Sequence, residues 1–124
     1  MAGVMDEASR GAHDAGGLVV GVLPDSDDGH MSRHVDIAIK TDMGSARNNI
    51  NVLSSDVVVA CGLGAGTASE VSLALKADKP VVLVSVPQED FEFFSRLSPK
   101  LVRHANSATE AISIVKELLL KLNR

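Results

Sequence analysis

One short stretch, residues 56–77, limits the possible folds more than any other part of the chain. It reads DVVVACGLGAGTASEVSLALKA. The apolar run at 57–61 is typical of a strand covered on both faces of a parallel sheet. Glycines at 62, 64 and 66 follow, and the segment from Thr67 has the apolar spacing of an amphipathic helix. The stretch predicts a strand, a glycine turn and a helix, with a buried, unreactive thiol at Cys61.

This glycine turn has two interpretations. Alternate glycines permit positive φ angles and close approach of a ligand, and the free N–H groups at a helix start favour an anion such as phosphate. Alternatively, the turn only joins a strand to a helix. Thr67 and Glu70 fit the T-x-x-E capping box, in which each side chain bonds the backbone amide of the other residue. Glu70 then has a purely structural role.

Composition excludes several classes of protein. With 124 residues and 45% apolar content, the chain is expected to form a single domain over residues 1–124. No apolar run has membrane-span length, so no membrane partner is expected. A net charge of −4 and three clustered aromatic residues argue against nucleic acid as a partner. The lone cysteine excludes a disulfide framework, and the absence of a secretory leader indicates the cytoplasm.

Strand and helix signals alternate along the rest of the chain. We expect strands at 18–23, 35–40, 80–86 and 101–104, the first and third of them buried. Helices are expected at 3–15, 45–54, 89–97 and after Ser107, which forms a second capping box with Glu110. This order predicts an α/β, Rossmann-like fold with a mainly parallel sheet and helices on both faces. No histidine has metal-ligand spacing, so no metal site is predicted.

The helix predicted at 45–54 contains an anomaly. Ser45 is the expected N-cap, with Ala46, Ile50 and Leu53 facing inward. Arg47 then lies in the first turn, where a cation opposes the helix dipole at a cost of about 0.3–1 kcal/mol. It is either an indifferent surface residue or half of an anion site. The asparagines at 48, 49 and 51 are poor helix formers, which indicates either hydrogen bonding by their amides or simple exposure.

Segments 45–49 and 64–70 are similar to the LOG family, once described as lysine-decarboxylase-like, and residues 3–5 and 11–24 resemble it too. The resemblance implies a Rossmann-type fold. The family includes cytokinin-activating hydrolases, and the resemblance implies that Arg47 and Glu70 of this chain correspond to their catalytic arginine and glutamate. Gly62, Leu63 and Asn48 replace a proline, a glycine and a lysine of the hydrolase pattern. One implied function is therefore hydrolysis of the N-glycosidic bond of a nucleoside 5′-monophosphate.

Segments 44–55 and 64–76 resemble the molybdenum cofactor carrier proteins more closely. That resemblance implies a homo-oligomer, a tetramer or a dimer, that binds and protects the molybdenum cofactor (molybdopterin). The pterin ends in a phosphate and is passed to a molybdoenzyme. The implied cofactor site consists of Ser45, Arg47, Asn48, Gly62, Gly64, Ala65, Gly66, Thr67 and Glu70. A third interpretation is a structural oligomer whose glycine turn has lost its ligand.

Members of the carrier family begin with a strand, a helix and a second strand before the segment that starts here at residue 2. We therefore expect this chain to have an unpaired, apolar sheet edge. Such an edge predicts self-association and a lower stability than that of a longer relative.

Overall fold

The computed structural model describes residues 3–29 and 31–122. The chain divides into two compact units, residues 1–47 and 48–124. That these units form the single domain expected from the chain length stays a prediction. Among the described residues, no helix is both long enough and apolar enough to cross a membrane.

The first unit is a helix followed by a pair of parallel strands and one turn of 3-10 helix. Its elements are α1 (Val4–Asp14), β1 (Val20–Leu23), β2 (Ile37–Lys40) and η1 (Gly44–Ala46). Val20 of β1 is opposite Ile37 of β2. Gly16, with φ 84°, follows α1 and has the left-handed backbone that commonly ends a helix.

The expectation that the strand at 18–23 is buried is wrong. Val20 is 46% exposed, and Ile37 and Ile39 on the same face of β2 are exposed as well. α1 has no buried residue, and its polar contacts reach the segment after residue 30. There Ser32 donates a hydrogen bond to Asp6. One face of this strand pair is therefore left without a covering layer inside its own unit.

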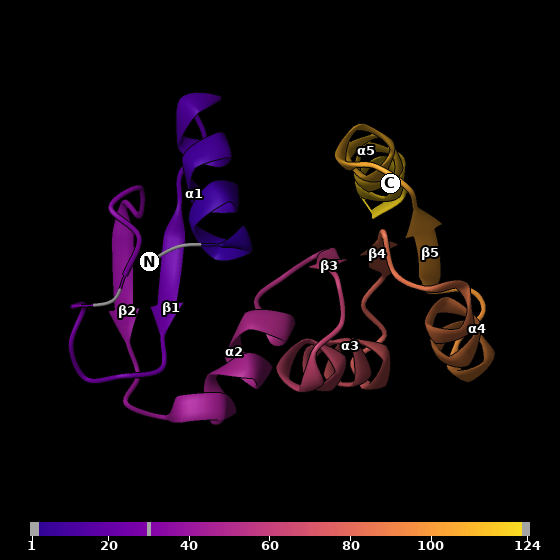
Figure 1. Cartoon of the computed structure of the whole chain (residues 1–124), viewed down its shortest axis with the longest axis horizontal. Helices are drawn as coiled ribbons and strands as arrows, with labels where there is room; N and C mark the ends of the chain where they lie inside the picture. Colours follow the sequence, from indigo (N-terminus) through magenta and orange to yellow (C-terminus); the bar gives the residue numbers. More distant parts are fainter. Residues whose placement is uncertain (1–2, 30, 123–124) are drawn as a thin grey trace. The chain divides into compact units, whose positions relative to one another are not determined.

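The second unit is a three-stranded parallel sheet in the order β3-β4-β5. Its elements are α2 (Arg47–Leu53), β3 (Val58–Cys61), α3 (Ala65–Lys76), β4 (Val81–Val84), α4 (Gln88–Leu97), β5 (Val102–Ala105) and α5 (Ala108–Leu122). The first of these helices, α2, starts at the last residue of the first unit. Figure 1 shows α3 and α4 on one side of these strands and α5 on the other.

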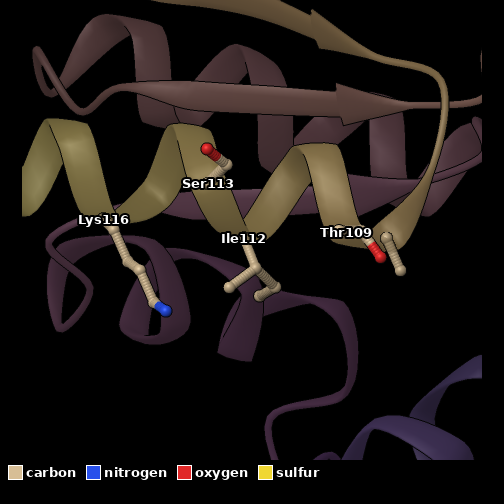
Figure 2. Close-up of a pocket in the computed structure, with 5 residues that line it drawn as sticks. Thr109, Ile112, Ser113 and Lys116 are labelled. Carbon is tan, nitrogen blue, oxygen red and sulfur yellow. The ribbon is translucent and has the colours of Figure 1, made fainter.

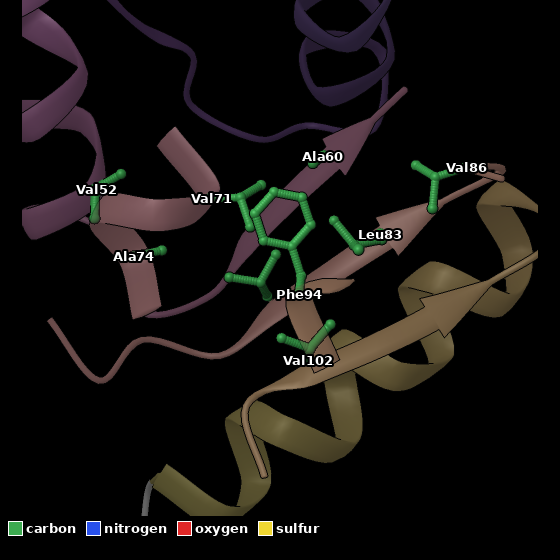
Figure 3. Packing of buried hydrophobic residues seen from close by; sticks show 9 residues of the cluster. Val52, Ala60, Val71, Ala74, Leu83, Val86, Phe94 and Val102 are labelled. Atoms are coloured by element: carbon green, nitrogen blue, oxygen red, sulfur yellow. The ribbon is translucent and has the colours of Figure 1, made fainter. Parts of the chain in front are cut away.

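Two hydrophobic cores hold this sheet between its helices. The central strand β4 is buried along its whole length, and its side chains alternate between the two cores. Leu83 belongs to the first core, where Phe94 of α4 lies among valines and alanines of α3 and the sheet (Figure 3). Val82 belongs to the second core, with Ile114 of α5. The predicted α/β, Rossmann-like architecture with helices on both faces is thereby confirmed.

Candidate functional site

The glycine turn after β3 has one glycine in a left-handed conformation. Gly62 has φ 82°, and its N–H donates to the carbonyl of Val84 at 3.4 Å, which joins the turn to the end of β4. Gly64 is extended, with φ −101° and ψ −178°, and is the N-cap of α3. The predicted strand, turn and helix are present, and the turn lies at the carboxyl end of a parallel strand, the edge where such sheets bind ligands.

The predicted capping box at Thr67 and Glu70 is wrong. α3 starts at Ala65, and the N–H of Ala68 donates to the carbonyl of Gly64 at 2.9 Å. Thr67 therefore lies inside the first turn, and no side chain caps the helix. The helix begins earlier than the side-chain pattern indicates because the extended backbone of Gly64 already provides the N-cap geometry. The amides of the first turn are left to solvent or to a ligand.

The second predicted capping box is present in the structure. Ser107 accepts a hydrogen bond from the amide of Glu110 at 3.1 Å. The Glu110 carboxylate reaches back and accepts from the amide of Asn106 at 3.0 Å, one residue before the serine. The start of α5 is therefore capped by side chains, whereas the start of α3 is not.

Gly64 and Gly66 are glycines that the fold itself does not require. Neither has a positive φ, and a Cβ atom built on either would meet nothing within 4 Å. Ala65, between them, is exposed and equally small. Small residues thus surround the uncapped start of α3, and the space in front of them is open. This is the arrangement that lets a ligand approach backbone N–H groups.

Glu70 lies one turn further along α3, half-buried and without a capping role. It lines a cavity of about 240 Å³ together with Asn51, Ser55 and residues 57–59. The Ser55 hydroxyl donates to the carbonyl of Asn51 at 2.6 Å. Glu70 therefore lines a cavity beside the beginning of β3, whereas the glycine turn follows the end of that strand.

Ser45 and Arg47 belong to the first unit. Ser45 is exposed within η1 and caps no helix, so its predicted N-cap role is wrong; the α-helix itself starts at Arg47. Nη1 of Arg47 donates to the carbonyl of Val22 at 3.0 Å. A carbonyl dipole thus partly compensates the cation whose position opposes the helix dipole. The remaining N–H groups of the guanidinium are still available to an anion.

Asn48 starts the second unit and is buried, with 7% of its surface exposed. The predicted inward face of this helix is wrong, because Ala46 and Leu53 are exposed whereas Asn48 and Val52 are buried. The shift follows from the 3-10 turn at η1, which delays the start of the α-helix and so rotates its inward face.

The expectation of a buried thiol at Cys61 is also wrong, since this cysteine is exposed. Val59 is on the same face of β3 and is 43% exposed. The apolar run resembles that of a fully covered strand, but α5 packs against β4 and β5 and leaves this face of β3 open. Burial of an apolar run depends on its neighbours, which the run itself does not reveal.

Ser85, which no sequence motif identifies, lies directly after β4. Its φ is 55°, an uncommon value for a residue with a Cβ atom. Its amide donates to the carbonyl of Ala105 at 2.9 Å, and its hydroxyl donates to that of Asn106 at 3.3 Å. Ser85 thus follows the strand whose last residue, Val84, bonds Gly62. A serine after a buried strand carries no motif, so only its backbone conformation identifies it.

Among residues 3–29 and 31–122, no group of three or more histidine, cysteine, aspartate or glutamate side chains is arranged to hold a metal ion. The site therefore offers backbone N–H groups, small side chains and one glutamate. This donor set suits an anionic organic ligand better than a bare metal ion.

Parallel strands, crossover helices and a glycine turn at the strand end define an α/β protein of the Rossmann-like class. The SLOG cluster4 family matches residues 1–116, and the chain belongs to this family.

Solved structures similar to this one include proteins that bind a cofactor. The molybdenum cofactor binding protein of the phototrophic bacterium Rippkaea orientalis is 50% identical, with a TM-score of 0.87 over 93% of this chain and 71% of that chain. The Moco carrier protein of Chlamydomonas reinhardtii is 55% identical, with a TM-score of 0.88 over 96% of this chain and 72% of that chain.

A curated relative extends the comparison to another organism. An uncharacterized protein of Archaeoglobus fulgidus is 46% identical over 87 residues, which make up 70% of this chain. The match spans only 57% of that relative's length.

Proposed function

We propose that this chain binds the molybdenum cofactor and carries it in a protected form. Support comes from carrier and binding proteins that are 50–55% identical and share the fold over more than nine-tenths of this chain. The observation that carries the proposal is the open space in front of Gly64 and Gly66. The fold does not need glycine at either position, whereas a ligand lying against the backbone does.

The terminal phosphate of the pterin is the part that this turn would bind. The free amides at the start of α3 are oriented toward the position of an anion, and the helix dipole adds a favourable field. Gly62, Gly64, Ala65, Gly66 and Thr67 would surround the phosphate. No acidic residue lies in the first turn of α3, so nothing there repels a negative charge.

Four further residues complete the proposed site. Arg47 would add charge-assisted hydrogen bonds through the guanidinium N–H groups that do not hold Val22. Ser45 and Asn48 would contribute neutral polar contacts to the pterin. Because Glu70 lines a cavity beside the beginning of β3, it would shape the wall of the site at a distance from the phosphate.

We also propose that the two units act as one ligand-binding domain over residues 1–124. The carrier function would operate in the cytoplasm as a homo-oligomer, a tetramer or a dimer, with a molybdoenzyme as the recipient. A carrier must later release its cofactor unchanged to a partner. Such a site would therefore hold its ligand through backbone groups and without chemical reaction.

A titration tests the proposal directly. The chain has no Trp or Tyr, so the pterin absorbance can be followed in the near ultraviolet with little protein background. Freshly released molybdenum cofactor is added under anaerobic conditions, and saturable binding is expected. Adenosine monophosphate is tested in parallel with detection of free adenine. Release of adenine that disappears in Glu70→Gln would replace the carrier proposal by the hydrolase.

A pair of glycine variants tests where the ligand binds. Gly66 and Gly11 are both helical glycines whose added Cβ would meet nothing within 4 Å. Gly66→Leu is expected to weaken cofactor binding about tenfold or more, because its side chain fills the proposed phosphate position. Gly11→Leu is the matched control and should leave binding unchanged. Equal binding by both variants would exclude the turn as the site.

A further inference from the structure

The three strands of the second unit end at the same level. Cys61 of β3 is opposite Val84 of β4, and Val84 is opposite Ala105 of β5. Ser85 and Asn106, which follow the last two strands, are both exposed. Because the strands are parallel, these two residues lie at the same carboxyl edge as the glycine turn. This is the edge where a parallel sheet binds its ligand, so a ligand at the turn is within reach of Ser85.

Ser85 has a backbone conformation that its place in the chain does not explain. Among the described residues, Asp42, Asp78 and Ser85 are the non-glycine residues with positive φ. Aspartate adopts this conformation more often than most residues do. Asp78 also follows the C-cap of α3, where a left-handed residue is common. Ser85, with φ 55°, directly follows a buried strand and has neither reason. Strained residues of this kind cluster at ligand sites.

The side chain of Ser85 needs an explanation as well, because a glycine would adopt the same conformation without strain. The hydroxyl donates to the carbonyl of Asn106 at 3.3 Å, a long hydrogen bond between exposed groups. Such a bond contributes little to stability. Since this carbonyl accepts the hydroxyl proton, the lone pairs of the serine oxygen are left for a donor. Ser85 therefore presents a hydrogen-bond acceptor at the carboxyl edge.

An acceptor in this position suits one end of the proposed ligand and not the other. Phosphate oxygens are acceptors themselves and are better served by the free amides at the start of α3. A pterin ring carries an amino group and a ring N–H, which are both donors. Neighbouring strands lie about 4.8 Å apart, so the ends of β3 and β5 are separated by about 10 Å. A fused-ring cofactor with a phosphate arm can span that separation.

We propose that the Ser85 hydroxyl accepts a hydrogen bond from an N–H donor of the pterin ring. The ring then lies across the carboxyl ends of β4 and β5, with the phosphate at the glycine turn after β3. The carbonyl of Asn106 orients the hydroxyl by accepting its proton. This inference rests on the proposed cofactor-binding function and adds the residue that distinguishes a pterin from an anion without N–H donors.

The second unit also has a cavity along α5, which offers a competing position for the ring. Its volume is about 470 Å³, and its lining residues, among them Ile112, Ser113 and Lys116, all belong to that helix (Figure 2). A ring bound there would lie along the helix and not across the strand ends. Ser113 is exposed like Ser85, so removing its hydroxyl tests this position in the same way.

A glycine at residue 85 tests the proposal. Ser85→Gly removes the hydroxyl and also relieves the strain, so cofactor binding should weaken about tenfold while the melting temperature stays equal or rises. Ser85→Ala keeps the Cβ atom and should lose the same binding. Anaerobic titration with the molybdenum cofactor, followed by the pterin absorbance, gives the affinities of the whole chain and its variants.

Two variants serve as matched controls. Asp78→Gly also places a glycine at an exposed left-handed residue, but this residue precedes β4 and so lies toward the opposite edge of the sheet. Ser113→Ala removes an exposed hydroxyl within the α5 cavity. Both variants should bind the cofactor as the unmodified chain does.

Inorganic phosphate separates the two ends of the ligand. It should shift the NMR signal of the Gly64 amide equally in the unmodified chain and in Ser85→Gly, because phosphate has no N–H donor for Ser85. Gly66→Leu should lose this shift together with cofactor binding. A phosphate response that disappears in Ser85→Gly would place the phosphate at the serine and overturn the proposal.

Other results would overturn the proposal in distinguishable ways. Full cofactor binding by both Ser85 variants, with binding still weakened in Gly66→Leu, would exclude Ser85 and leave the proposed function intact. Weakened binding in Ser113→Ala would place the ring along α5. A lower melting temperature in Ser85→Gly would assign the serine to its hydrogen bond with Asn106. Absence of cofactor binding by the unmodified chain would reject the proposed function and this inference with it.

Discussion

The two units have similar strands but very different cores. In the second unit, apolar side chains from every strand and from four helices are buried in two cores. In the first unit, Val19 and Leu23 are the buried apolar residues among those described, and α1 buries none. Apolar strands alone therefore do not create a buried core. A strand pair needs a layer on each face, and only the second unit has such layers.

Separating the units should give the largest effect. Residues 48–124 are expected to fold alone and to unfold cooperatively, because both cores lie within them. Residues 1–47 should be largely unstructured alone, since a two-stranded sheet is marginal in water. Circular dichroism and thermal melting of the two fragments measure this. A cooperative melt of the shorter fragment would contradict the comparison.

Shortening one apolar side chain in each unit should give the next largest difference in stability. Leu83 is fully buried in the centre of the second unit, so Leu83→Ala is expected to lower the free energy of unfolding by about 2–5 kcal/mol. Val20→Ala in the first unit should change it by less than about 0.5 kcal/mol, because Val20 is half exposed. Urea titration of both variants gives the values. Similar losses would show that β1 is covered in solution.

The two predicted capping boxes provide a smaller and sharper test. Ser107→Ala should lower the free energy of unfolding by about 0.5–2 kcal/mol, because the hydroxyl accepts a hydrogen bond from the amide of Glu110. Thr67→Ala should lower the free energy of unfolding by less than about 0.5 kcal/mol, because the start of α3 has no side-chain cap. Thermal unfolding measures both values. Equal losses of stability in the two variants would show that Thr67 caps α3, as the sequence predicts.

The smallest effect concerns pH and the first unit. The hydrogen bond from Ser32 lowers the pKa of Asp6 from its ordinary value. This carboxylate therefore contributes stability above its unfolded pKa, and that contribution is lost as the pH falls through the lowered folded value. A carboxyl-carbon NMR titration should show the lowered pKa, and Ser32→Ala should raise it toward the ordinary value. An unchanged titration in that variant would assign the shift to another cause.

The order of the elements could be predicted from the sequence, because strands such as β4 are short, continuous apolar runs. The exposure of Cys61 and Val20 could not, because it depends on which strands and helices lie beside them. The start of α3 is not evident in the sequence, because glycine can supply N-cap geometry without a side-chain signal. Ser85 has no sequence signature, because its distinguishing feature is a backbone angle.

For the candidate site, the glycine turn was predictable because its residues are contiguous in sequence. The partner of Arg47 cannot be predicted from the sequence, because Val22 lies 25 residues earlier in the chain and its carbonyl has no sequence signature. A charge pattern indicates that an arginine needs an electron-rich partner, but it does not say whether that partner is a ligand or the backbone.

This hydrogen bond of Arg47 also determines which replacements the position tolerates. A guanidinium is a rigid, planar fork that can hold the carbonyl of Val22 through one nitrogen and present its other nitrogens to an oxyanion at a fixed angle. A lysine ammonium is a compact point charge whose single nitrogen would have to serve both acceptors. Arginine and lysine are thus not interchangeable at residue 47, even though the exchange leaves the net charge of the protein unaltered.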